Sequence, residues 1–149
     1  LIVAAQSFHW FNNDATKQEF RRILKTNGYL ALIWNQADLT DNFQLQLDQA
    51  LQTFAVDYNQ VKHSNLSVVE ISHFFQANTM KEYCFDNSQS YDLIGLLGRI
   101  ESCSYCPQYQ SIAHLQLTTV LEELFYEYAN NNLLNIKQTC KLYIGRLNV

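Results

Sequence analysis

The first eleven residues, LIVAAQSFHWF, constrain the fold of this chain more than any other segment. Residues 1–5 are apolar without alternation, a pattern typical of a strand that is buried on both faces in a parallel sheet. A polar and aromatic group at residues 6–11 follows, where the strand would end. In open α/β sheets, ligands bind at the carboxyl ends of the strands. The segment therefore predicts a core strand whose end faces a ligand.

A second apolar run at residues 29–35 ends in Trp34 and Asn35. Between the two runs, an apolar stripe predicts a helix over residues 14–24, capped by Asn12, Asn13 or Asp14. Gly28 is expected to take the left-handed conformation that ends this helix. These elements form a βαβ unit, and a parallel sheet of two strands needs cover on both faces. The pattern therefore predicts that the chain is the later part of a larger domain.

Periodicity predicts further helices at residues 41–58, 67–75, 92–102 and 111–128, and strands at 80–85 and 136–147. The expected order is β-α-β-α-α-β-α-α-β. The apolar stripe of the helix at 111–128 is expected to hold Ile112, Leu115, Leu121, Leu124, Phe125 and Tyr128.

The chain has 149 residues, of which 48% are hydrophobic, so it can build the core of one domain. Its net charge is −4, and its basic residues are scattered apart from Arg21, Arg22 and Lys25, so we expect no nucleic-acid partner. No apolar run approaches the roughly 20 residues that span a bilayer, so no membrane partner is expected. A chain rich in core residues needs no disulfides, which favours reduced cysteines and a cytoplasmic location.

The pair Cys103 and Cys106 supplies at most two zinc ligands and lacks the strand-then-helix context of a redox motif. We therefore interpret it as incidental packing and expect no metal site. His63, His73 and His114 have no partner at a metal-binding interval, and each is expected to lie at the surface or to be half-buried.

Several segments resemble one enzyme family. The runs AAQSFHWF (4–11), EFRRILK (19–25) and GYLALIWN (28–35) resemble the fourth strand, the following helix and the fifth strand of class I S-adenosylmethionine-dependent methyltransferases. The subgroup that they match is the small-molecule one that includes relatives of trans-aconitate methyltransferase. The runs FDNSQSY (85–91), GRIESCSYCP (98–107) and LYIGRL (142–147) resemble the C-terminal half of that subgroup.

The resemblance implies an α/β fold: a partial Rossmann-like methyltransferase sheet with strands four to seven and their flanking helices, and with the N-terminal cofactor half missing. Residues 1–149 would then be the C-terminal part of a single methyltransferase domain. Helical segments around 41–75 and 91–129 would cover the cleft. The last two strands would form an antiparallel edge, with the final strand inserted beside the one at 29–35.

The implied function is methyl transfer from S-adenosyl-L-methionine to a small molecule, with a carboxylate as one candidate acceptor. The Gly-rich cofactor loop and the acidic residue for the ribose have no counterpart in the sequence. We therefore expect this chain alone to bind the cofactor weakly or not at all, and to be inactive.

The resemblance places Gln6, Phe8, His9 and Trp10 between cofactor and substrate. Gln6 and Phe8 are cofactor-binding candidates, and Gln6 and Trp10 are substrate-binding candidates. His9 is the catalytic candidate, as a general base or as a group that orients a substrate carboxylate, because imidazole titrates near neutral pH. The alternative is that His9 and Trp10 wedge the strand end against the following helix.

Asn35 can offer a donor and an acceptor to a substrate, although asparagine also commonly stops a strand. Trp34 is expected in the core or the cleft wall. A further substrate-binding group consists of Arg99, Ser102, Ser104 and Tyr105.

Arg99 would bind a carboxylate through two parallel hydrogen bonds. The alternative for Arg99 is neutralisation of the dipole at the C-terminal end of its helix.

A second hypothesis comes from a different class of function. The chain would be a non-catalytic methyltransferase remnant that acts as an interaction module. The unpaired edge of the strand at residues 1–5 would then drive self-association.

Overall fold

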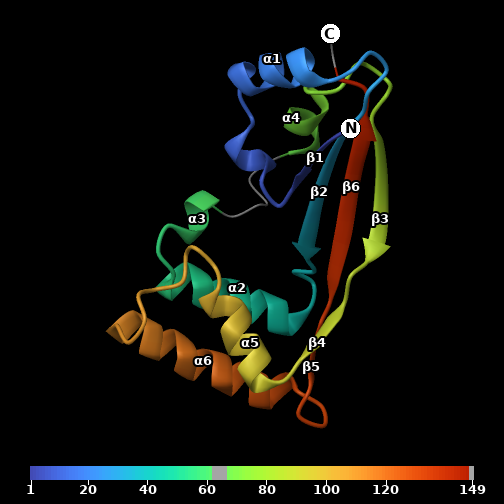
Figure 1. The fold of residues 1–149 in the computed structure, drawn as a ribbon. Helices are drawn as coiled ribbons and strands as arrows, with labels where there is room; N and C mark the ends of the chain where they lie inside the picture. The colour runs from blue at the N-terminus through green and yellow to red at the C-terminus, as the bar shows by residue number, and fades with distance from the viewer. Residues whose placement is uncertain (62–66, 148–149) are drawn as a thin grey trace. The chain divides into compact units, whose positions relative to one another are not determined.

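The structure is a computed structural model that describes residues 1–61 and 67–147 (Figure 1). The strands are β1 (Ile2–Ala5), β2 (Leu30–Ala37), β3 (Lys81–Asp86), β4 (Gln89–Tyr91), β5 (Leu134–Ile136) and β6 (Gln138–Gly145). The helices are α1 (Asp14–Ile23), α2 (Asn42–Phe54), α3 (Tyr58–Val61), α4 (Val68–Ser72), α5 (Leu93–Glu101) and α6 (Ile112–Tyr128), with a short 3-10 helix, η1, at Phe8–Trp10. The chain divides into two compact units, one of residues 1–36, 63–87 and 139–149 and the other of residues 37–62 and 88–138.

The first unit holds a mixed sheet whose order, within the described residues, is β1-β2-β6-β3. β1 and β2 are parallel, in a register that runs from Ile2 opposite Leu30 to Ala5 opposite Ile33. β3 and β6 are antiparallel, and β6 lies between β2 and β3. Figure 1 shows the arrows of β2 and β6 pointing in opposite directions. The predicted insertion of the final strand beside the second strand is therefore confirmed.

Helix α1 matches the predicted helix to within one residue at its C-terminal end. Its N-cap is Asn13, whose side chain accepts a hydrogen bond from the Thr16 N–H at 2.9 Å. The basic residues Arg21 and Arg22 lie in its last turn, where cations interact favourably with the helix dipole.

The turn after α1 differs from the prediction, because Asn27 and not Gly28 has a positive φ, of 66°. The Gly28 N–H donates to the Lys25 carbonyl at 2.8 Å, so Asn27 takes the third position of a type II turn. Glycine is needed at position 28 for a different reason. A Cβ there would lie 2.7 Å from Leu24 Cγ and 2.8 Å from the Lys25 carbonyl oxygen, so the turn packs too closely for a side chain.

Aromatic side chains build the core of the first unit. Phe8 is fully buried, and its ring meets Phe74 edge-on at 4.7 Å and Trp34 at 6.0 Å. Lys17 in α1 donates to the carbonyl of His73 just after α4, and its Nζ lies 5.5 Å from the Phe74 ring. The buried members of this core are Ala4, Phe8, Leu30, Leu32, Trp34, Ile71, Phe74, Phe75, Tyr143 and Leu147.

β1 is less buried in this chain than its sequence predicts. Ala4 is buried and Ile2 packs against the same core, whereas Val3 is 52% exposed. Successive side chains of a strand point to opposite faces, so one face of β1 packs on the core and the other is open. Within this chain β1 is therefore covered on one face, and cover of its other face stays a prediction.

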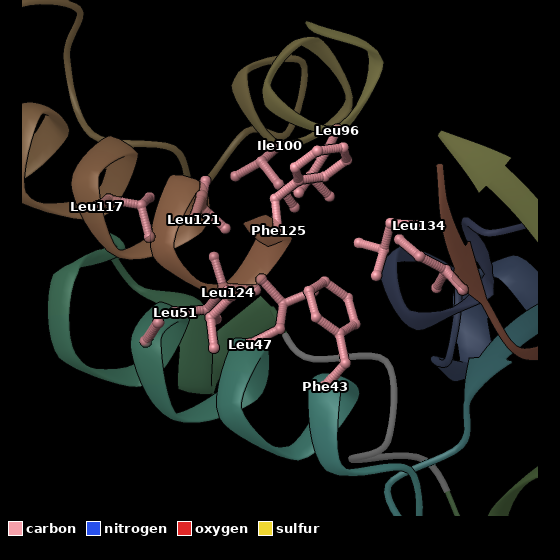
Figure 2. Close-up of a cluster of buried hydrophobic side chains, with 12 residues drawn as sticks. Phe43, Leu47, Leu51, Leu96, Ile100, Leu117, Leu121, Leu124, Phe125 and Leu134 are labelled. Carbon is pink, nitrogen blue, oxygen red and sulfur yellow. The ribbon is translucent and has the colours of Figure 1, made fainter. Parts of the chain in front are cut away.

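The second unit is built from α2, α5 and α6 with the two-stranded sheet of β4 and β5. Figure 2 shows leucines and phenylalanines from these helices pointing toward one another. The buried members are Phe43, Leu47, Ala50, Leu51, Leu96, Ile100, Leu117, Leu121, Leu124, Phe125, Leu134 and Ile136.

The helix expected at 41–58 ends at Phe54, because Ala55 is already extended, with a ψ of 146°. Asp57, with a φ of 54°, then turns the chain before α3. β4 was not predicted, and the strand expected at 136–147 is divided into β5 and β6. β3 pairs with β6, whereas β4, which follows β3 after two residues, pairs with β5. Hydrophobic periodicity along the sequence does not detect such a change of pairing partner.

The stripe predicted for α6 is partly wrong. Leu121, Leu124 and Phe125 are buried as expected, but Ile112 is 78% exposed and Leu115 is 56% exposed. His114 and Leu117 are buried instead, because positions 114, 117, 121 and 124 repeat at helical spacing on the face that meets the core. The expectation that His114 lies at the surface or is half-buried is therefore also wrong. His73 is exposed, and His63 lies outside the described residues.

A buried carboxylate lies within the second unit. Asp48 in α2 is 8% exposed and accepts hydrogen bonds from the Tyr58 hydroxyl at 2.7 Å and the Gln52 amide at 2.6 Å. The Tyr58 ring in turn meets the Tyr105 ring edge-on at 5.0 Å. Burial, together with the Asp48 carboxylate, raises the pKa of Tyr58 above the usual range.

Two glycines form a matched pair for a stability test. Gly28→Ala should lower the free energy of unfolding by about 1–3 kcal/mol, since the new methyl group overlaps the Lys25 carbonyl. Gly98→Ala in α5 meets no atom within 4 Å and should raise it by about 0.5–1 kcal/mol. Urea unfolding of both variants measures the difference. A Gly28→Ala variant as stable as the parent would contradict the close packing of the turn.

Tyr58→Phe should lower the free energy of unfolding by about 1–3 kcal/mol, because buried Asp48 loses a donor. The raised pKa also predicts a pH effect. Unfolded Tyr58 loses its proton near pH ~10, whereas the folded state keeps it, so stability should fall as the pH rises above that value. Tyr58→Phe should reduce this fall, whereas Tyr126→Phe, at a ring that is 70% exposed, should leave it unchanged. Urea midpoints at about pH 8 and about pH 11 test this.

Candidate functional site

The residues predicted to face a ligand after the first strand gather at one edge of the sheet in the first unit. We call Gln6, Phe8, His9, Trp10, Trp34 and Asn35 the strand-end cluster. Ala5 pairs with Ile33, and the Gln6 N–H donates to the Ile33 carbonyl at 2.9 Å, so the next residues, Gln6 and Trp34, lie level with each other. Gln6 ends β1 with a φ of 52°, in the left-handed region.

Two polar atoms of this cluster are buried without a hydrogen-bond partner among the described residues. They are the Gln6 side-chain oxygen, an acceptor, and Trp34 Nε1, a donor. Trp34 is 4% exposed, with its ring edge-on to Phe8 and, at 6.1 Å, to Tyr143. Buried polar groups are nearly always satisfied in folded proteins, so this donor and acceptor on neighbouring strands call for a partner such as water or a ligand.

His9 and Trp10 lie on η1, directly beyond Gln6. The two rings are 4.8 Å apart and tilted by 48°. Burial lowers the pKa of His9 below the usual value near ~6.5, so the imidazole is neutral at pH 7 and can accept a proton. Trp10 is 65% exposed and offers a free aromatic face.

Phe8 and Asn35 take different places from those that their sequence positions suggest. Phe8 has no exposed surface, so within this chain it reaches a cofactor only through the side chains that pack on it. Asn35 is half-buried, and β2 continues beyond it to Ala37. The interpretation of Asn35 as the residue that stops the strand is therefore wrong.

The second predicted group lies at the C-terminal end of α5, in the other unit. The Arg99 guanidinium lies over the Tyr91 ring, 5.3 Å from its centre, and its Nη1 is buried without a partner among the described residues. The Ser102 hydroxyl donates to the Arg99 carbonyl at 2.7 Å, so it satisfies the helix end. Ser104 is exposed, whereas Tyr105 is half-buried, and burial together with the Cys103 side chain raises its pKa.

The structure therefore brings Gln6, His9, Trp10, Trp34 and Asn35 together in one unit and Arg99, Ser102, Ser104 and Tyr105 together in the other. The sequence analysis missed Tyr91 and Tyr58, the aromatic partners of Arg99 and Tyr105. It also assigned Trp34 only to the core or the cleft wall. The core position is confirmed, but the unmatched Nε1 depends on the tertiary packing around the ring, which the sequence alone does not reveal.

The remaining chemistry of the described residues is limited. No three or more histidine, cysteine, aspartate or glutamate side chains in residues 1–61 and 67–147 gather as metal ligands would. All four cysteines are free thiols. Within the same residues, none of the helices combines the length and apolarity needed to cross a bilayer.

Comparisons with known proteins add two kinds of similarity, although no family model matches the chain. Over 40 residues, 27% of its length, the chain is 50% identical to an uncharacterized methyltransferase-like protein of Schizosaccharomyces pombe. Over 38 residues, 26% of its length, it is 53% identical to an uncharacterized methyltransferase of the same yeast. These segments cover 16% and 15% of the two yeast proteins.

The structural comparison covers far more of the chain. A solved structure from Anaeromyxobacter dehalogenans, described as a type II methyltransferase, aligns with 97% of this chain and 63% of its own chain, at a TM-score of 0.51 and 14% identity. The chain therefore spans less than two thirds of the length of each protein that it resembles here. At 14% identity the likeness concerns the fold, and it agrees with the mixed sheet described above. The fold of this chain is methyltransferase-like.

Proposed function

We propose that this chain belongs to an S-adenosylmethionine-dependent methyltransferase that acts on a small molecule, and that the strand-end cluster lines the space between cofactor and acceptor. One observation carries the proposal. The Gln6 side-chain oxygen and Trp34 Nε1 are a buried acceptor and a buried donor, unmatched among the described residues, at the carboxyl end of β1 and level with that end on β2. Ligands of open α/β sheets bind at such ends. The methyltransferase-like fold supports the same assignment.

Methyl transfer requires few specific side chains. The cofactor supplies a methyl group on a positively charged sulfur, and the protein contributes orientation, a dry pocket and in some cases a base. His9 suits the last role, because burial keeps its imidazole neutral at pH 7. Gln6 is assigned to the contact with cofactor or acceptor, Phe8 to packing behind the cofactor, and Trp10 and Asn35 to the acceptor.

Within the second unit, we assign Arg99 to the binding of a carboxylate. Its Nη1 is a buried donor without a partner among the described residues, and guanidinium binds carboxylates through paired hydrogen bonds. Its place over the Tyr91 ring limits its rotation. Ser104 and Tyr105 follow at short range and offer hydroxyls to the same group. The four free thiols support a reducing, cytoplasmic setting.

A second candidate function rests on β1. This strand is the last member of its sheet within the described residues, and Val3 is 52% exposed beside Leu1, which is 77% exposed. An open strand edge beside apolar side chains favours pairing with another chain. The chain would then be a non-catalytic interaction module. Size-exclusion chromatography over a range of concentrations separates the two functions, because only this second one requires association.

Cofactor titration tests how much of the site these residues supply. Because the sequence has no Gly-rich loop after a strand, isothermal titration of the 149-residue chain with S-adenosylmethionine should show no saturable heat. Micromolar binding would contradict the assignment of the main cofactor contacts to residues outside this sequence.

In a preparation that shows methyltransferase activity on a small carboxylate, His9→Ala should lower kcat by about 10²–10⁴-fold, as expected for loss of a general base. The pH profile should remain flat to below pH ~6.5, since burial lowers the pKa of His9 and only the protonated form is inactive. His73→Ala, at an exposed histidine of the same unit, is the matched control and should leave kcat unchanged. Equal activity of both variants would remove His9 from the mechanism.

A further inference from the structure

A pocket of about 350 Å³ lies in the first unit, at the turn between α1 and β2. Its size is at the lower end of the range for small-molecule sites. Its walls come from the end of α1, the turn that follows, the segment after α4 and the end of β6. The lining residues are Arg21, Leu24, Lys25, Thr26, Asn27, Gly28, Gln76, Arg146 and Leu147.

Three of the residues that line this pocket carry a positive charge. Arg21, Lys25 and Arg146 are three of the ten lysine and arginine residues of the chain, and no aspartate or glutamate is among the lining residues. The chain as a whole has a net charge of −4, so the local positive charge at this pocket is opposite in sign to the net charge of the chain.

The helix dipole accounts for only part of this arrangement. Arg21 and Lys25 lie at the C-terminal end of α1, where cations are favourable in any protein. Arg146 directly follows β6 and is far from α1 in the sequence, so the dipole of α1 does not explain its position in the chain. Its backbone is held on both sides, since the Gln76 N–H donates to its carbonyl at 2.8 Å and its own N–H donates to Thr79 Oγ1 at 3.2 Å. The fold therefore holds this third cation at the pocket.

We propose that this pocket binds a tetrahedral oxyanion of the phosphate class, as free phosphate or as a small soluble phosphomonoester. Arginine binds such oxyanions through paired hydrogen bonds, and lysine adds a compact charge. Thr26, Asn27 and Gln76 supply neutral hydrogen-bonding groups, and Leu24 and Leu147 supply apolar surface for the organic part of an ester.

The pocket is separate from the strand-end cluster. It adjoins Gly28, before the first residue of β2, whereas Trp34 lies six residues further along the chain. At about 3.3 Å per residue of strand, the two sites are about 20 Å apart. Binding of an oxyanion at this pocket is therefore independent of the proposed methyltransferase function.

Phosphorus NMR on the 149-residue chain tests the site, with inorganic phosphate and glycerol phosphate as probes at constant ionic strength. Line broadening should saturate with each probe. A stronger response to the ester would identify a phosphomonoester as the natural ligand, and an equal response would identify free phosphate. Arg146→Gln and Lys25→Gln should each weaken binding by about tenfold or more, because each removes a charged donor. All of these side chains are exposed, so the variants should fold, and circular dichroism checks this.

Arg22→Gln is the matched control. Arg22 lies on the same helix and carries the same charge, but it is paired with Glu19 at 2.6 Å and does not line the pocket. It should leave phosphate binding unchanged. Equal losses in Arg22→Gln and Arg146→Gln, or displacement of phosphate by an equal concentration of chloride, would show a general attraction to surface charge and overturn the proposal.

Discussion

The parallel pairing of β1 with β2 determines where every candidate residue of the first unit lies. Because Ala5 is opposite Ile33, Gln6, the first residue after β1, comes level with Trp34, and β2 continues beyond this level to Ala37. A shift of one residue in this register would turn Trp34 away from Phe8, which follows β1. The aromatic core and the unmatched polar atoms of the cluster therefore depend on the same set of backbone hydrogen bonds.

Local sequence signals predicted the elements of this unit well. Asn13 caps α1 as expected, and the apolar run before Asn35 forms β2. The position of β6 between β2 and β3 was implied by family resemblance and not by periodicity, because a pattern along one strand carries no information about its neighbours. The positive φ of Asn27 was assigned to Gly28, since glycine is the usual residue there, and only coordinates show that Gly28 serves close packing.

The predictions that failed share a physical cause. Ile112 and Leu115 are apolar but exposed, and His114 is polar but buried against the Tyr109 ring at 5.1 Å, with Nε2 3.3 Å from a Glu101 carboxylate oxygen. Hydrophobic spacing alone therefore predicts the wrong buried face for the first turns of α6. Burial of Asp48 was likewise invisible in the sequence, because its cost is offset by Tyr58 and Gln52, whose approach depends on tertiary structure.

The contrast between the two indoles has an optical consequence. The chain has two tryptophans, and Trp34 is 4% exposed whereas Trp10 is 65% exposed. Trp34 emits from an apolar enclosure and Trp10 from water, so their fluorescence spectra are offset, and a dissolved quencher reaches Trp10 far more readily. Tryptophan fluorescence therefore reports separately on the buried part of the strand-end cluster, at Trp34, and on its exposed part, at Trp10, without any added label.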